Sequence, residues 1–234
     1  MVNPEITVII PTYNRASILQ RTIKSLCEEQ SGCIPSWEVI VVNDGSIDET
    51  SQVLNQLVKR YNGQLTSVYQ KNQKQGAARN NAMGRARGRL FVFLGDDMVP
   101  DSTFLNNHWR RFVAEGQPNG YAAIGRTYWH PEIKETPFRK WINEWGLQFG
   151  FQLIHDPDKL PFNFFYTSNL AFSRDLYDNL GGFDRSFRDY GWEDIELGYR
   201  YMINGNMRLR CVEDAVTYHH HYLTVTTFCK RQFK

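Results

Sequence analysis

The sequence predicts an α/β fold with a mostly parallel, Rossmann-like central sheet flanked by helices. Residues 5–10 and 37–42 are β-branched apolar runs of strand length. Their near-continuous apolarity indicates strands that are buried on both faces, as in a parallel sheet. Residues 16–30 and 48–61 place apolar side chains at helical spacing. Strand and helix therefore alternate as they do in βαβ units.

The same alternation continues to about residue 100 and then loosens. No stretch of linker composition divides the chain, so residues 1–234 are predicted to form a single domain. The other expected elements are strands at 65–69, 90–94, 121–125 and 165–172, helices at 76–87, 102–115 and 192–203, and a final strand pair around 208–219.

Composition and charge exclude several classes of protein. The formal net charge of +2 gives no global field toward nucleic acid or an anionic membrane, so no nucleic-acid partner is expected. No window of about 18 apolar residues is present, and the chain enters its first strand without the regions of a signal peptide. The four cysteines lack CxxC spacing, which favours reduced thiols. We therefore expect a cytoplasmic protein.

Three polar loops follow predicted strands, at residues 11–15, 43–46 and 95–97. In an open α/β sheet, ligands bind beyond the carboxyl ends of the strands, so these loops are candidates for one site. Asp44 could accept hydrogen bonds from a base or ribose, or it could cap the next helix or hold the turn with Gly45.

Gly76 opens a predicted helix that offers Arg79 and Asn80 within its first turns. Free backbone N–H groups at such a start can host an anion. The segment lacks the motifs of a phosphate loop and of a dinucleotide fingerprint, and Arg79 is equally compatible with a solvated surface cation.

Asp96 and Asp97 are adjacent carboxylates at the end of an apolar strand. Their repulsion needs compensation, which a divalent cation bridging to a diphosphate would supply; the alternative is an exposed turn before Pro100. His219 and His221 follow another apolar strand and would face one way in an extended chain, so they could converge on the same metal.

Gly191, Trp192, Glu193 and Asp194 place a second acidic pair at a predicted helix start. Acids favour this position for dipole and capping reasons alone. Two separate acidic pairs suggest two tasks, namely a metal ligand and a general base.

Aromatic residues from 137 to 151 recur at steps of three or four residues. They indicate a helix face packed on the core, or else a surface for a sugar acceptor or lipid-linked substrate.

Together these segments resemble the family 2 glycosyltransferases of the GT-A fold, over roughly residues 5–221. The matching segments lie in the same order as in the family. They are Val8-Ile9-Ile10-Pro11-Thr12-Tyr13-Asn14-Arg15, Val41-Val42-Asn43-Asp44-Gly45-Ser46, Gly76-Ala77-Ala78-Arg79-Asn80, Phe93-Leu94-Gly95-Asp96-Asp97, and Gly181-Gly182-Phe183-Asp184 through Gly191-Trp192-Glu193-Asp194.

The resemblance implies a nucleotide-binding half at about 1–100 and an acceptor-binding half at about 101–234. It implies that Asp194 is the catalytic base, that its neighbour Glu193 contacts the acceptor or sugar, and that Asp97 binds Mn²⁺ or Mg²⁺ with His219 or His221. Gly95 replaces the first acid of the family's Asp-x-Asp motif, which leaves the role of Asp96 open between ribose and sugar. The implied nucleotide- and donor-binding residues are Pro11, Thr12, Tyr13, Arg15, Asp44, Gly76, Arg79, Asn80, Asp96, Asn169 and Trp192.

The implied reaction moves a sugar from a nucleotide diphosphate, expected to be a UDP-sugar, to an acceptor hydroxyl with inversion. Expected partners are this donor and a saccharide, lipid-linked or protein acceptor, in polysaccharide or glycoconjugate synthesis, with peripheral membrane association as a further expectation. Two alternatives stay open: a nucleotidyltransferase that makes nucleotide sugars, and a non-catalytic carbohydrate-binding domain.

Overall fold

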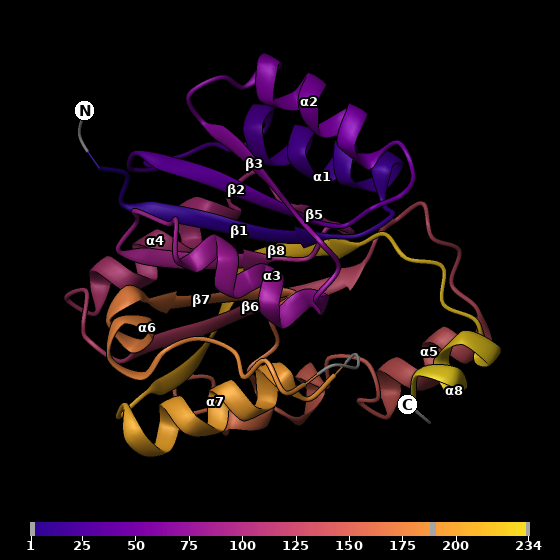
Figure 1. Ribbon diagram of the computed structural model, residues 1–234. Coiled ribbons are helices and arrows are strands. Elements are labelled where there is room, and N and C mark those ends of the chain that lie inside the picture. Colours follow the sequence, from indigo (N-terminus) through magenta and orange to yellow (C-terminus); the bar gives the residue numbers. More distant parts are fainter. Residues whose placement is uncertain (1–2, 188–190, 233–234) are drawn as a thin grey trace.

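The computed structural model describes residues 3–187 and 191–232. Its centre is an eight-stranded sheet in the order β3-β2-β1-β4-β7-β6-β8-β5 (Figure 1). The strands are β1 (Ile6–Thr12), β2 (Trp37–Asp44), β3 (Leu65–Gln70), β4 (Leu90–Leu94), β5 (Met98–Pro100), β6 (Tyr121–Trp129), β7 (Asn169–Ser173) and β8 (Arg208–His219).

Helices connect and flank these strands. They are α1 (Ala16–Glu28), α2 (Thr50–Arg60), α3 (Lys74–Met83), α4 (Phe104–Ala114), α5 (Pro137–Glu144), α6 (Arg174–Leu180), α7 (Glu193–Asn204) and α8 (Val225–Gln232), with short 3-10 turns at Phe151–Leu153 and Phe162–Phe164.

The first half of the sheet is parallel, as the sequence predicts. β1 lies between β2 and β4, and β3 pairs with β2, all in parallel register. The second half is mixed, because β7 runs antiparallel to both β4 and β6 while β6 and β8 are parallel. The predicted α/β class with a Rossmann-like sheet is therefore confirmed, and the strand reversal begins at β7.

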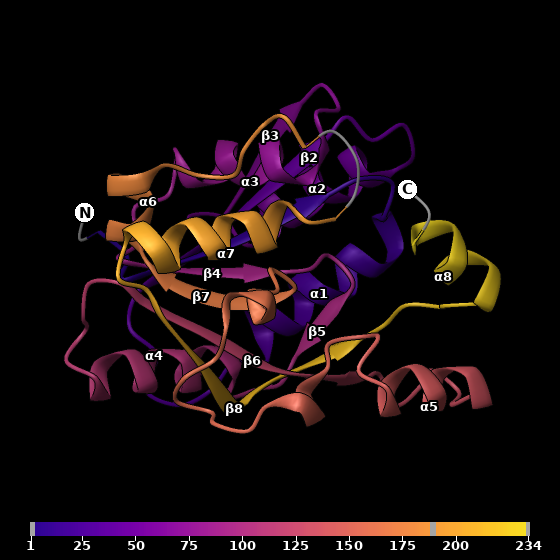
Figure 2. The ribbon, with the colours of Figure 1, turned by 90° about the horizontal axis from the view of Figure 1, so that it is seen from below.

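Two apolar layers hold the helices on the sheet. On one face α1, α2 and α4 pack against inward residues such as Val8 and Val92. On the other face α3, α6 and α7 pack against alternate residues such as Ile9 and Phe93 (Figure 2). Each central strand is thus buried on both faces, which explains its unbroken apolar sequence.

Several predicted elements differ from the observed ones. The expected strand pair around 208–219 is one long strand, β8, because it follows β6 past a register shift between Gly125 and Thr127. The strand expected at 165–172 begins only at Asn169, after a 3-10 turn. The helix expected at 76–87 is shifted to Lys74–Met83, so Gly76 lies within its first turn.

The aromatic stretch is partly packed and partly exposed. Only Pro137–Glu144 is helical, and Phe138 packs edge-on against Phe228 of α8. Figure 1 shows α5 and α8 together, at one end of the molecule. Trp141 and Trp145 are exposed at 48% and 67%, so this part of the stretch faces solvent.

Asn169, the first residue of β7, is a polar anchor inside the sheet. Its amide nitrogen donates to the carbonyls of Arg126 and Ala215 and to Thr217 Oγ1, and its amide oxygen pairs with His108 Nε2 at 2.9 Å. Burial lowers the pKa of His108 to about 4, so this ring is neutral at physiological pH. The position of Asn169 therefore favours a structural role over the expected donor contact.

Within the described residues, no helix is both long and apolar enough to cross a membrane. All four cysteines are free thiols, in agreement with their spacing in the sequence.

Replacing Asn169 with alanine is expected to lower the free energy of unfolding by about 2–4 kcal/mol, because each buried polar group left unpaired costs about 1–3 kcal/mol. Denaturant unfolding measures this, with Asn179→Ala on the exposed surface of α6 as the control. Unchanged stability together with weakened nucleotide binding would instead make Asn169 a donor contact.

Candidate active site

The carboxyl ends of β1, β2 and β4 meet at one edge of the sheet, as parallel neighbours must. Thr12 Oγ1, at the end of β1, donates a hydrogen bond of 2.7 Å to Oδ2 of Asp96, which follows β4. The loops after β1 and β2 are joined by a bond from the Asn14 backbone N–H to Ser46 Oγ at 2.9 Å. The three polar loops singled out in the sequence therefore form one continuous rim.

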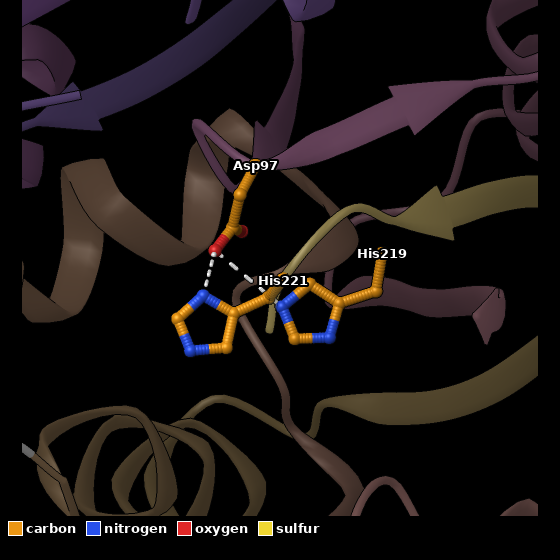
Figure 3. A group of neighbouring side chains, drawn as sticks. All are labelled: Asp97, His219 and His221. Atoms are coloured by element: carbon orange, nitrogen blue, oxygen red, sulfur yellow. Dashed lines mark ion pairs between the residues drawn. The ribbon is translucent and has the colours of Figure 1, made fainter. Parts of the chain in front are cut away.

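Asp97 converges with His219 and His221 on this rim. His219 Nε2 and His221 Nδ1 each lie 3.4 Å from the same oxygen, Asp97 Oδ2 (Figure 3). The two imidazole rings stack at 5.4 Å between centroids with planes 6° apart. Arg15 joins them, with a guanidinium nitrogen 3.7 Å from Asp97 Oδ2 and another 3.3 Å from His221 Nδ1.

Strand pairing brings these distant residues together. β5 pairs with β8 so that Met98 stands opposite His219, and the His220 backbone N–H donates to the Asp97 carbonyl. The alternation of an extended chain then turns His219 and His221 to one side and His220 to the other. On the inner side Trp129 of β6 stacks on His219 at 5.2 Å, which fixes the ring plane.

The two adjacent carboxylates have different electrostatic environments. Burial, followed by the charge of Asp97, raises the pKa of Asp96 to about 7. Burial also acts to raise the pKa of Asp97, but His219, Arg15 and His221 outweigh it and lower this pKa to about 2. Asp97 is therefore the carboxylate that stays ionised at neutral pH.

Asp97, His219 and His221 fit a divalent cation. One carboxylate oxygen and two imidazole nitrogens lie within 4.8 Å of one another. A neutral imidazole offers one ring nitrogen with a lone pair, and His221 Nδ1 lies 3.3 Å from the Arg15 guanidinium, which can only donate. An ionised carboxylate with imidazole lone pairs is a donor set for Mn²⁺-type cations.

A second group of possible ligands consists of His130, Glu132 and His220, and alternation turns His220 away from His219 and His221. Arg21 already neutralises Glu132 there by donating to both of its carboxylate oxygens. This second group is consequently a weaker metal candidate.

Some of the residues expected around the nucleotide are exposed on the rim, and others are hydrogen-bonded inside the fold. Tyr13 is 46% exposed on the rim, whereas Asp44 is buried and its Oδ1 accepts from Gln70 and from the Gln73 backbone. Asn80 is occupied by a reciprocal pair of bonds with the backbone of Phe183, at 2.7 and 2.8 Å. Its direction favours a structural clamp over the expected phosphate contact.

Arg79 and Glu193 form a buried ion pair at 2.9 Å, with side-chain exposures of 7% and 3%. Arg79 is thus not the solvated cation that the sequence left open. Glu193 faces the protein interior, and this direction gives it partners other than an acceptor sugar.

Asp194, the next residue, is a shielded carboxyl with a raised pKa. Thr167 Oγ1 lies 3.5 Å from Asp194 Oδ2, and the Ile195 N–H donates to Oδ1 at 3.0 Å. Burial, followed by the charge of Glu193, raises its pKa to about 6, against the lowering influence of Arg79. A carboxyl group whose pKa lies just below 7 is mostly ionised at neutral pH and is still basic enough to accept a proton. Trp192 stands before it, 74% exposed.

Residues 149–168 connect the metal candidate with Asp194. The Gly95 N–H donates to the Ser168 carbonyl, next to the Thr167 that contacts Asp194. Phe149 contacts the His219 ring at 5.7 Å and the Tyr166 ring at 6.5 Å. Phe149 belongs to the aromatic stretch for which the sequence allows an acceptor surface, whereas no sequence pattern indicates Trp129, since its partner His219 is distant in the chain.

Comparison with known proteins supports the architecture. Residues 7–181 match the family described as "Glycosyl transferase family 2". Residues 156–224, which include Asp194 and the histidines, match "N-terminal domain of galactosyltransferase".

Curated relatives and solved structures point the same way. A validoxylamine A glucosyltransferase of Streptomyces hygroscopicus subsp. jinggangensis is 29% identical over 86% of this chain and 52% of that protein. A chondroitin synthase of Escherichia coli is 27% identical over 92% of this chain and 34% of its own length. The chain therefore spans about a third to a half of these relatives.

Two solved structures share the fold. The mannosyltransferase PcManGT from Pyrobaculum calidifontis, in complex with GDP-Man and Mn²⁺, superposes with a TM-score of 0.69 at 23% identity, over 94% of this chain and 58% of that one. S. aureus TarS 1-349 in complex with UDP-GlcNAc gives 0.68 at 19% identity, over 97% and 64%. With the family match extending over residues 7–181, the chain belongs to glycosyl transferase family 2.

Proposed function

We propose that this chain is a metal-dependent, inverting glycosyltransferase that moves a sugar from a nucleotide diphosphate to an acceptor hydroxyl. The convergence of Asp97, His219 and His221 beside a separate, raised-pKa Asp194 carries this proposal. The first group suits the leaving diphosphate, and the second suits the acceptor proton. The curated relatives that are named synthases of polysaccharides support polymer or glycoconjugate synthesis as the setting.

On the donor side, the chain supplies a cationic and hydrogen-bonding rim. Arg15 is positioned to approach a diphosphate, since its guanidinium is 37% exposed beside Asp97. Tyr13 offers an exposed ring for a nucleobase, and Asp44 lies behind it at the end of β2. Asp96, tied to Thr12, remains the contact proposed for ribose or sugar. A divalent cation held by Asp97, His219 and His221 would offset the charge of the departing diphosphate.

On the acceptor side, Asp194 accepts the proton of the attacking hydroxyl. Thr167 and the Ile195 N–H hold the two oxygens of this carboxylate in fixed directions. Attack by the deprotonating hydroxyl on the anomeric carbon, opposite the leaving diphosphate, is a single displacement and inverts the anomeric configuration. Trp192 offers an exposed ring beside this carboxylate, and aromatic rings stack on sugar faces.

For the donor we propose a UDP-sugar, a choice supported by the similar S. aureus TarS structure in complex with UDP-GlcNAc. For the cation we propose Mn²⁺, because imidazole nitrogens suit transition metals better than they suit Mg²⁺. A thermal-shift screen of UDP and GDP sugars with Mn²⁺ identifies the donor, since a ligand of the folded state raises the melting temperature. Pyrophosphate release from UTP and a sugar phosphate would instead favour a nucleotidyltransferase.

Asp97→Ala is expected to abolish Mn²⁺-dependent binding of UDP, because it removes the only anionic member of the three ligands. Calorimetry with Mn²⁺ and with EDTA measures this. His220→Ala is the matched control, since His220 is a neighbouring imidazole that alternation turns away from His219 and His221. Binding that is indifferent to EDTA would contradict the assignment.

Asp194→Asn is expected to lower turnover by about 10²–10⁴-fold while UDP affinity stays near that of the wild type, because a general base supplies about this factor. Steady-state transfer kinetics test this. Asp178→Asn, at an exposed position of α6, serves as the control. Full turnover in Asp194→Asn would remove this residue from the mechanism.

Turnover at saturating donor should rise with pH and level off above about pH 6, because Asp194, with its pKa raised to about 6, must be ionised to accept a proton. Transfer rates measured from pH 5 to 8 at saturating donor test for this rise and plateau. A rate that is flat from pH 5 to 8, or that falls as the pH rises through 6, would contradict this role.

A further inference from the structure

We propose that the buried pair Arg79–Glu193 is a positioning device that holds Asp194 at the active site, and that neither side chain contacts the donor. This inference rests on the proposed function only in calling Asp194 the base. Arg79 lies on α3, next to the nucleotide rim, and Glu193 is the first residue of α7. The pair therefore joins the two halves of the site.

Among residues 3–187 and 191–232, every hydrogen-bond partner of the Glu193 side chain lies inside the fold. Its Oε1 accepts from Arg79 Nη1 at 2.9 Å and from Gln75 Nε2 at 2.5 Å, and its Oε2 accepts from the Gly191 N–H at 3.1 Å. The side chain is 3% exposed. A carboxylate held in this way is a fixed point for the start of α7.

The segment before α7 is fastened to the same helix, α3. Asn80 holds the Phe183 backbone at both its N–H and its carbonyl, and the Arg79 guanidinium lies 5.3 Å from the centre of the Phe183 ring. Gly76 favours this close approach, because a Cβ there would lie 3.3 Å from Phe183 Cβ, which is closer than most Cβ contacts. α3 thus contacts the chain on both sides of residues 188–190.

The turn into α7 needs such a support. Trp192 adopts φ 70°, a left-handed conformation that is unfavourable for a residue with a side chain, and it makes no side-chain capping bond. Successive helical residues point about 100° apart. Fixing Glu193 toward Arg79 therefore directs Asp194 toward Thr167 instead of toward α3.

The charges of the pair also act on Asp194. Glu193 raises the pKa of Asp194 and Arg79 lowers it, while Thr167 and the Ile195 N–H stabilise its ionised form. Tyr166 faces the same carboxylate, and its own pKa is raised to about 12, first by burial and then by the charge of Asp194. Removing one partner leaves the other as an uncompensated buried charge, so the two residues should act as a unit.

Two variants separate positioning from donor contact. Glu193→Gln keeps the shape of the side chain but leaves Arg79 unpaired, which should lower the pKa of Asp194. Arg79→Lys keeps the charge but loses the planar group that reaches both Glu193 and Gln75. The control is Glu38→Gln, which alters a comparably buried glutamate paired with Arg87 at the opposite edge of the sheet.

Three readouts are needed. NMR of ¹³C-labelled aspartate, assigned with Asp194→Asn, follows the pKa of Asp194 without any substrate. Amide hydrogen exchange at residues 191–196 reports the order of the helix start, and steady-state kinetics with calorimetry separate kcat from donor affinity. We expect Glu193→Gln to lower the Asp194 pKa and speed exchange, and both variants to lose about 10- to 100-fold in kcat at unchanged UDP affinity, since a small misplacement can cost about 10²-fold.

Glu38→Gln should change none of these readouts. Unaltered Asp194 pKa and exchange in Glu193→Gln would overturn the proposal, and so would weakened UDP binding with normal kcat, which would make the pair a donor contact. If the intact chain transfers no sugar but the pKa and exchange respond as expected, the proposed function fails and the positioning role stands.

Discussion

Two adjacent carboxylates at the end of a buried strand impose the constraint around which this site is built. Asp96 and Asp97 repel one another, and the structure separates their environments. Asp96 bonds to Thr12 within its own half of the sheet, and its pKa rises. Asp97 obtains its compensation from the other half, through His219 and His221 at the end of β8. The contacts of Asp96 and Asp97 therefore connect the first strand-helix units with β8, the last strand.

A second acidic pair shows the same separation. Glu193 points inward to Arg79, and Asp194 points to Thr167. In both pairs one acid is bonded within the fold, and the other is the acid for which we propose a chemical role. The loops that carry the two acids proposed for the chemistry, Asp97 and Asp194, are linked by the backbone bond from Gly95 to Ser168.

Local chain geometry made much of this predictable. Strand periodicity and parallel order place the loops after β1, β2 and β4 together, and alternation along β8 turns His219 and His221 to the same side. Side-chain direction over long range was not predictable. A motif identifies Asn80, Asn169 or Glu193 by type, but whether each faces a ligand or the interior depends on partners such as Phe183, Ala215 and Arg79. The aromatic stretch does not form a single helix, because Gly146 and Gly150 adopt positive φ angles that end the helical path.

The metal and donor sites can be located in a crystal structure of the chain with Mn²⁺ and UDP, using anomalous scattering from manganese. We expect one anomalous peak in contact with Asp97 and with at least one of His219 and His221, a diphosphate on the opposite side of that ion, and an intact Arg79–Glu193 pair. A manganese peak away from Asp97, or Arg79 released from Glu193 and bound to the diphosphate, would contradict this expectation.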